Sequence, residues 1–294
     1  MAALSAAHAQ TTNTWNINAS GLWNVATNWS PTNIPNGIGT VAFFGSNITA
    51  ARTITNDAAV TLGGMEFGTN TFAYTINNEL GALIFDGLGA TSFINIHASN
   101  SANNQILTTN GTVLIADRLV INHDGSGTFT FAGAMASFGL NPGLTVSGAS
   151  TNQVILLAGG NGFNDSTFNG SVNLDRVTVR VDADRAFGAV GNAVNFTNGA
   201  TLFFRTNFTV DAGRVFTFNS DSSLLVTNVT GVTRWNAANR LMGPGNLTKS
   251  GLGSIVVGQS NVNYTGAVFV NAGGIVVSNA AALGSNTRVT VSPL

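Results

Sequence analysis

Residues 247–291 read LTKSGLGSIVVGQSNVNYTGAVFVNAGGIVVSNAAALGSNTRVTV, in which short apolar runs alternate with Gly, Asn and Ser turns. The run Val268–Val270 returns as Val289–Val291, and the run Ile255–Val257 returns at nearly the same interval as Ile275–Val277. Two series of strands therefore interleave at one period, with no helical pattern between them. A fixed period of about 20 residues predicts a solenoid in which each repeat forms one coil.

The same stretch resembles a known family. Its segments LTKSGLGSIVV, NYTGAVFVNAGGIVV and AAALGS are similar to the autotransporter-associated β-strand repeat of bacterial passenger proteins. The matching positions are Leu247, Thr248, Lys249, Gly251, Gly253, Tyr264, Thr265, Gly266, Val270, Asn271, Gly273, Gly274, Leu283 and Gly284. The resemblance implies a secreted right-handed parallel β-helix, often displayed at the cell surface. It covers about one seventh of the chain, and the repeat is not specific for any activity.

We therefore expect an all-β, right-handed parallel β-helix (a β-solenoid), with helix content near zero after residue 10. The final repeat, within residues 245–294, has a degenerate counterpart within residues 143–204. Two pairs of triplets are separated by the same interval: 168–170 with 264–266, and 186–188 with 282–284. Six apolar residues of the last coils are expected to be buried: Val268, Val270, Ile275, Val277, Val289 and Val291.

Residues 46–294 read as one solenoid, because short strands continue from 46 to 140 with no linker before the repeats begin. Turn pairs such as Asn110-Gly111 and Asp124-Gly125 separate these strands. Such pairs also favour tight hairpins, so an antiparallel sandwich is the alternative for this half of the chain.

The composition favours a β-protein whose surface is polar without being charged. Hydrophobic residues make up 44% of the 294 residues, whereas charged residues make up only 8%, against about 25% in a typical domain. Lys249 is the single lysine and the net charge is −1. No basic patch could neutralise phosphates, which excludes a nucleic-acid partner. The absence of cysteine excludes disulfides and thiolate chemistry.

The N-terminus, residues 1–10, reads MAALSAAHAQ and contains the A-x-A pattern Ala7-His8-Ala9. It is typical of the tail of a signal peptide, and we interpret it as a signal-peptide remnant. An ordinary Ala-rich overhang is the alternative. A membrane-spanning helix needs roughly 18 or more consecutive apolar residues. No such run is present, so no membrane insertion by this segment is expected.

Residues 11–45 contain three of the four tryptophans, Trp15, Trp23 and Trp29. A solenoid needs terminal caps, and tryptophan buries a large apolar area. We therefore predict a Trp-rich N-terminal cap in which these side chains are buried. The alternative is an aromatic platform, since indole faces stack on sugar rings.

No catalytic, cofactor-binding or metal-binding constellation is evident. His97 and His123 have no local ligand partners and are expected at the surface or in turns. Asp182–Asp184 resembles a fragment of a calcium loop without the rest of that motif. Asp165 lies about one coil before Asp182–Asp184, and Arg185 follows. Because glycan-degrading β-helices need acids clustered on adjacent coils, this is the one catalytic site to consider.

The sequence thus favours a non-enzymatic, secreted or cell-surface β-helix passenger, associated with a bacterial outer membrane, with a structural or adhesive role. A carbohydrate-binding module and a glycan-degrading β-helix enzyme are the alternatives. The expected partners are surface glycans or other passenger molecules. Arg288–Val291 reads as a complete strand with no capping sequence after it. We therefore expect a fragment of a longer protein, or a chain that self-associates through an open C-terminal coil.

Overall fold

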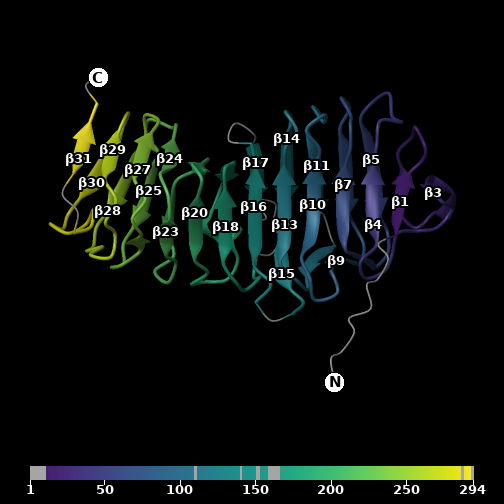
Figure 1. Cartoon of the computed structure of the whole chain (residues 1–294), viewed down its shortest axis with the longest axis horizontal. Helices are drawn as coiled ribbons and strands as arrows, with labels where there is room; N and C mark the ends of the chain where they lie inside the picture. Colours follow the sequence, from purple (N-terminus) through teal and green to yellow (C-terminus); the bar gives the residue numbers. More distant parts are fainter. Residues whose placement is uncertain are drawn as a thin grey trace.

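The chain folds as a parallel β-solenoid whose coils stack along one long axis (Figure 1). The structure is a computed structural model that describes residues 11–108, 111–139, 141–149, 153–157, 166–285 and 288–292. The proposed signal-peptide remnant at residues 1–10 lies outside these ranges. Within them, the two helical segments are the short 3₁₀ turns η1 (Ala26–Asn28) and η2 (Asp184–Phe187). The expected near absence of helix is confirmed for the described residues.

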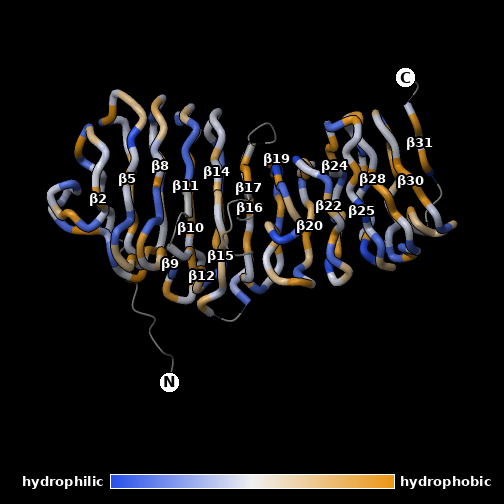
Figure 2. Tube along the Cα trace, turned by 180° about the vertical axis from the view of Figure 1, so that it is seen from behind, coloured by the Kyte–Doolittle hydropathy of each residue, from blue (hydrophilic) through white to orange (hydrophobic). Residues whose placement is uncertain are grey.

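Two long sheets form the sides of the solenoid. Sheet A lies toward the viewer in Figure 1 and contains, in spatial order, β26 (Leu241–Met242), β23 (Phe216–Phe218), β20 (Val194–Thr197), β18 (Val172–Asp175), β16 (Leu144–Gly148), β13 (Leu119–His123), β10 (Ser92–Ile96), β7 (Gly64–Phe67), β4 (Val41–Phe44), β1 (Thr12–Trp15) and β3 (Trp29–Ser30). Sheet B lies on the other side, seen in Figure 2, and contains β2 (Gly21–Leu22), β5 (Arg52–Asn56), β8 (Tyr74–Asn78), β11 (Asn104–Thr108), β14 (Thr128–Ala132), β17 (Gln153–Leu157), β19 (Thr178–Val181), β21 (Thr201–Phe204), β24 (Ser222–Val226), β27 (Leu247–Ser250), β29 (Val268–Val270) and β31 (Val289–Val291).

Two shorter sheets complete the coils, one in each half of the chain. Sheet C contains β15 (Met135–Ser137), β12 (Thr112–Ile115), β9 (Ala82–Phe85) and β6 (Val60–Leu62). Sheet D contains β22 (Phe208–Val210), β25 (Val232–Trp235), β28 (Ser254–Val257) and β30 (Gly274–Val277).

The core follows from alternation along each strand, which turns every second side chain into the coil. In β19, Val179 and Val181 are buried, whereas Thr178 and Arg180 are partly exposed. Parallel register then sets Val179 opposite Leu202 of the next coil. Because each apolar side chain is covered by the coils on either side of it, each coil is stabilised mainly by its neighbours.

The strand pairing confirms the interleaved repeat that the sequence predicts. Val268 of β29 pairs with Val289 of β31, and Ile255 of β28 pairs with Ile275 of β30. These are the same matches that the repeated apolar runs give. The first pair belongs to sheet B and the second to sheet D, so the two series are two sides of the same coils.

The expected burial of the last coils is only partly right. Val268 and Val270 are buried and Ile275 is partly buried, but three valines are exposed: Val277 (47%), Val289 (49%) and Val291 (66%). They belong to β30 and β31, the last strands of sheets D and B. Among the described residues no further coil covers these strands. The valines therefore remain exposed, although they continue the columns of inward-facing residues.

The N-terminal cap is confirmed. Trp15, Trp23 and Trp29 are at most 1% exposed, and β3 closes the end of sheet A by pairing antiparallel with β1. The Trp29 ring centroid lies 5.2 Å from that of Trp15 and 4.8 Å from that of Trp23. Phe44 of the next coil packs against Trp23 and Trp29, so the cap is joined to the solenoid core.

The antiparallel sandwich considered for the first half is wrong. The pairing of β1 with β3 is the one antiparallel ladder among the described strands, and the others are parallel. Asp124-Gly125 separates β13 of sheet A from β14 of sheet B. The turn therefore carries the chain to the next side of the coil instead of folding it back as a hairpin.

Candidate functional site

The tryptophans cannot form a sugar-binding platform in this fold, because their rings lie inside the cap. Trp23 Nε1 donates a hydrogen bond to the Pro35 carbonyl at 3.2 Å, and Trp29 Nε1 donates to the Trp23 carbonyl at 2.9 Å. The indole N–H groups of Trp23 and Trp29 are thus satisfied within the protein, as is usual for buried indoles. The observation that favoured a carbohydrate-binding role for these residues is removed.

The acidic segment considered for catalysis contains a structural ion pair. Asp184 accepts two hydrogen bonds from Arg214 of the next coil, from Nε at 2.8 Å and from Nη2 at 3.0 Å. Asp182 accepts a hydrogen bond from the Thr206 hydroxyl through its backbone carbonyl. Asp165 lies outside the described residues, and Arg185 is exposed. The Asp184 carboxylate is therefore ion-paired with the Arg214 guanidinium. It does not form the pair of neighbouring acids that a glycan-degrading site would use.

Arg214 is the buried centre of this arrangement, and the sequence analysis did not identify it. Its side chain is fully buried, and Nη1 and Nη2 also donate to three backbone carbonyls, those of Phe187 (3.4 Å), Asn192 (3.0 Å) and Gly188 (3.2 Å). The guanidinium also lies over the Phe187 ring at 5.4 Å from its centroid. A planar group with five donors suits such a set of acceptors. The role of Arg214 is to join two coils.

His97 and His123 lie in different environments. His97 is partly exposed, and its Nε2 lies 3.4 Å from Glu66 Oε2. His123 is fully buried at the end of β13, so its expected surface or turn position is wrong. In β13 the buried positions are Leu119, Ile121 and His123, so strand alternation turns the imidazole inward. Burial lowers the pKa of His123 to about 4, although nearby backbone groups and Asp124 oppose the shift.

Lys249 occupies an inward position between Leu224 and Val270 of the neighbouring coils. It is fully buried, and its Nζ donates to three backbone carbonyls: Ser250 (2.8 Å), Gly251 (2.7 Å) and Ala272 (3.1 Å). Burial lowers its pKa to about 8. All three donors of the ammonium are used by carbonyls at the end of β27 and in the turns of two coils, so Lys249 connects these coils.

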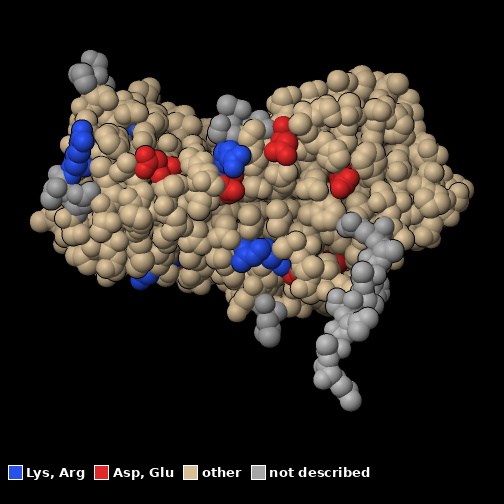
Figure 3. Space-filling model, viewed as in Figure 1, with Lys and Arg blue, Asp and Glu red and all other residues tan. Residues whose placement is uncertain are grey.

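The outer face of sheet A carries ladders of polar side chains. Ser147 Oγ donates to Asn122 Oδ1 at 3.1 Å, and Asn195 Nδ2 donates to Asn173 Oδ1 at 2.8 Å. Asn173 in turn donates to the Thr145 hydroxyl at 3.4 Å. Figure 3 shows few charged side chains on this side of the molecule, some of opposite sign beside one another. The ladders connect successive coils and leave a long, nearly uncharged polar face.

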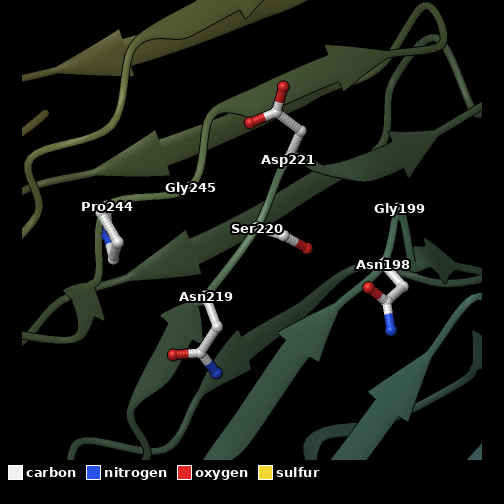
Figure 4. A pocket seen from close by; sticks show the side chains of 7 residues that line it. All are labelled: Asn198, Gly199, Asn219, Ser220, Asp221, Pro244 and Gly245. Carbon is white, nitrogen blue, oxygen red and sulfur yellow. The ribbon is translucent and has the colours of Figure 1, made fainter.

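The hollows on the surface are shallow and lie along the turns. One of about 520 Å³ is lined by Asn198, Gly199, Asn219, Ser220, Asp221, Pro244 and Gly245 (Figure 4). Ser220 points toward the Asn198 turn, whereas Asp221 points away from it. Asp221 accepts a hydrogen bond from the Asn246 backbone N–H, so its carboxylate fixes a turn. This hollow brings together one carboxylate, two amide side chains and the Ser220 hydroxyl, and the Ser220 and Asp221 side chains point in different directions (Figure 4).

The described residues contain no group of three or more His, Asp or Glu placed to hold a metal ion. Within the same residues, no helix has the length and hydropathy needed to cross a bilayer. Comparisons with protein-family models, curated proteins and solved structures found no match to this chain. The resemblance of residues 247–284 to the autotransporter-associated repeat can therefore support a proposal of function, but it does not assign the chain to a family.

Proposed function

We propose that this chain is a non-enzymatic passenger, secreted or displayed at a bacterial cell surface, with a structural and adhesive role. The observation that carries the proposal is the stack of coils with the long polar outer face of sheet A. An extended solenoid offers area for contact along its length, whereas catalysis needs convergent groups in a cleft. The repeat-like segment and the pattern at residues 1–10 support secretion.

The residues that invited an enzymatic interpretation support a structural role better. Asp184 binds Arg214, and the surface hollows lie along turns whose polar groups bond to one another. Other passenger molecules are one proposed partner class. Surface glycans are the other partner class, since amide and hydroxyl ladders offer both donors and acceptors.

Localisation in the host bacterium tests the proposal directly. An epitope is inserted after Val190, which is 75% exposed in the turn between β19 and β20, into the gene product as the host expresses it. We expect antibody to label intact cells, or the tagged protein to accumulate in the medium. A cytoplasmic marker with the same epitope is the control. Recovery of the tagged protein only in the cytoplasm would contradict the proposal.

Adhesion is tested with the purified chain. Beads coated with it should be retained under flow on bacterial and host-cell surfaces more strongly than beads coated with an unrelated β-protein of equal charge. Equal retention of the two kinds of bead would remove the adhesive part of the proposal, while leaving a purely structural role.

A further inference from the structure

The outer faces of sheets A and B differ in charge. Outward positions of sheet A include two carboxylates, Glu66 and Asp175, which lie on one column of paired residues. No outward position of the described strands of sheet B carries Asp or Glu, and its one outward charge is the guanidinium of Arg180. The two long sides of the solenoid would therefore attract different partners.

Arg180 lies in the middle of sheet B and stacks on an aromatic ring. Its guanidinium carbon is 4.7 Å from the centroid of the Phe203 ring, which belongs to the paired position of the next coil. Leu225 follows in the same column one coil further on, and Ile155 precedes Arg180. All four side chains are partly exposed. They form an apolar stripe with one cation held in place by a cation–π contact.

A column of hydroxyl groups runs beside this stripe. Thr178, Thr201, Ser223 and Thr248 occupy successive paired positions on β19, β21, β24 and β27. Neighbouring strands are about 4.8 Å apart, so the hydroxyls repeat at that interval along the solenoid axis. The strands of sheet B succeed one another along the same axis in Figure 2. An elongated ligand lying along that axis would meet one hydroxyl at each coil.

We propose that this part of sheet B binds an acidic polysaccharide, with Arg180 contacting a carboxylate or sulfate and the hydroxyl column contacting the sugar hydroxyls. The stripe at Phe203 and Leu225 would contact the apolar edges of the sugar rings. This inference names the partner of the adhesive role and rests on that proposed function.

The charges around Arg180 favour an anion. Arg205, one residue beyond β21, is exposed and close enough to lower the pKa of Arg180, as a second cause after burial. The described charges around the patch are Arg176, Arg180 and Arg205 on one side and Asp182 and Asp221 on the other. Among these residues the guanidinium groups outnumber the carboxylates, so an anionic group over the stripe gains attraction that a neutral one does not.

The test uses the full chain and three probes: polygalacturonate, carboxymethyl dextran and uncharged dextran of matched length. We expect both acidic polymers to bind and to weaken as salt rises, because the contact is partly electrostatic. Uncharged dextran should bind weakly or not at all. Equal binding of dextran and carboxymethyl dextran, or no binding of either acidic polymer, would overturn the proposal.

Matched variants locate the site. R180Q should weaken polygalacturonate binding about tenfold, the effect of losing roughly 1.4 kcal/mol from one charge-assisted contact. F203S should also weaken polygalacturonate binding, because it removes one apolar ring from the stripe, and Arg180 stacks on that ring. The controls are R234Q, an exposed arginine on sheet D, and F93S, an outward phenylalanine on β10 of sheet A. Equal losses in R180Q and R234Q would show that only overall charge matters and would reject this site.

The outcomes separate this inference from the proposed function. Surface localisation without polysaccharide binding would reject the inference and leave the passenger role. Binding by the purified chain together with a purely cytoplasmic location would reject the passenger role and leave the binding site. Each variant is compared with the parent by thermal unfolding, so that a folding defect is not mistaken for loss of the site.

Discussion

At the scale of single residues, the buried polar groups of this solenoid connect coils. Arg214 and Lys249 are both fully buried, and each donates to three backbone carbonyls in turns. Turns leave carbonyl groups without strand partners, and an unsatisfied buried carbonyl is costly. A long cationic side chain that enters the coil satisfies several such groups at once.

Removing the Arg214 guanidinium should strongly destabilise the protein. Arg214→Met leaves Asp184 without its ion-pair partner and three carbonyls without a donor. Breaking a buried pair from one side costs about 3–5 kcal/mol. Chemical denaturation measures the loss, and Arg234→Met, at an exposed position, should change stability by less than about 0.5 kcal/mol. Similar values for the two variants would show that Arg214 contributes little.

His123 should make stability depend on pH. Its pKa is about 4 in the folded chain and about 6.5 in the unfolded chain, so the unfolded state binds more protons between these values. The free energy of unfolding therefore holds its full value above about pH 6.5 and falls as the pH drops toward 4. The shift corresponds to roughly 3 kcal/mol.

Two variants isolate the His123 contribution from the other acids that titrate in this range. His123→Leu should flatten the difference in unfolding free energy between pH 6.5 and pH 4, measured in denaturant at both values. Ile121→Val, at a buried aliphatic residue of the same strand, should keep the pH dependence of the parent. If both variants retain the parental pH dependence, His123 does not titrate as described.

At the scale of elements, the N-terminal cap should be a large source of stability. Trp23 is fully buried against Trp29 and Phe44. Trp23→Ala removes this contact and opens a cavity, which should cost about 3–5 kcal/mol. Phe72→Ala, at a phenylalanine that is 41% exposed, is the control and should cost much less. Thermal and denaturant unfolding of the two variants measure the difference, and comparable costs would contradict a closing role for Trp23.

The sequence predicts the elements well where the repeat is regular. The sequence predicts that the runs 255–257 and 268–270 recur one coil later, and the structure pairs them with those recurrences. This works because paired residues of parallel strands are separated by one coil length. β7 and β11 lack a clear strand signal in the sequence: GMEF begins with glycine and contains a glutamate, and NQILT begins with two amide residues. Their strand conformation depends on the coils on both sides, which supply the pairing that local propensity does not.

The candidate site was less predictable than the fold. The inward position of His123 could have been read from the alternation of Leu119 and Ile121. The Arg214–Asp184 pair joins two different coils, so it depends on the exact coil length in a region of degenerate repeats. The stack of Arg180 on Phe203 likewise requires the register of two strands one coil apart. Composition and motifs carry no information on such pairs.

At the scale of the whole molecule, the two ends of the solenoid differ. The N-terminal end is covered by β3 and the tryptophans, whereas β30 and β31 leave three valines exposed at the other end. An uncovered last strand also presents backbone groups that can pair with another strand. The exposed valines lie at the β30–β31 end, so two copies of residues 11–292 would meet through these ends. Such a contact forms a closed dimer and not a filament.

Residues 11–292 should therefore associate in solution, with a dimer that dissociates on dilution in analytical ultracentrifugation. Val289→Lys combined with Val291→Lys places like charges in the contact and should leave a monomer. Val190→Lys and Val229→Lys, at valines that are 75% and 70% exposed away from this end, should leave the dimer intact. A polar capping coil grafted after Ser292 should have the same effect as the paired lysines. A parent chain that sediments as a monomer at high concentration would show that the exposed valines do not drive association.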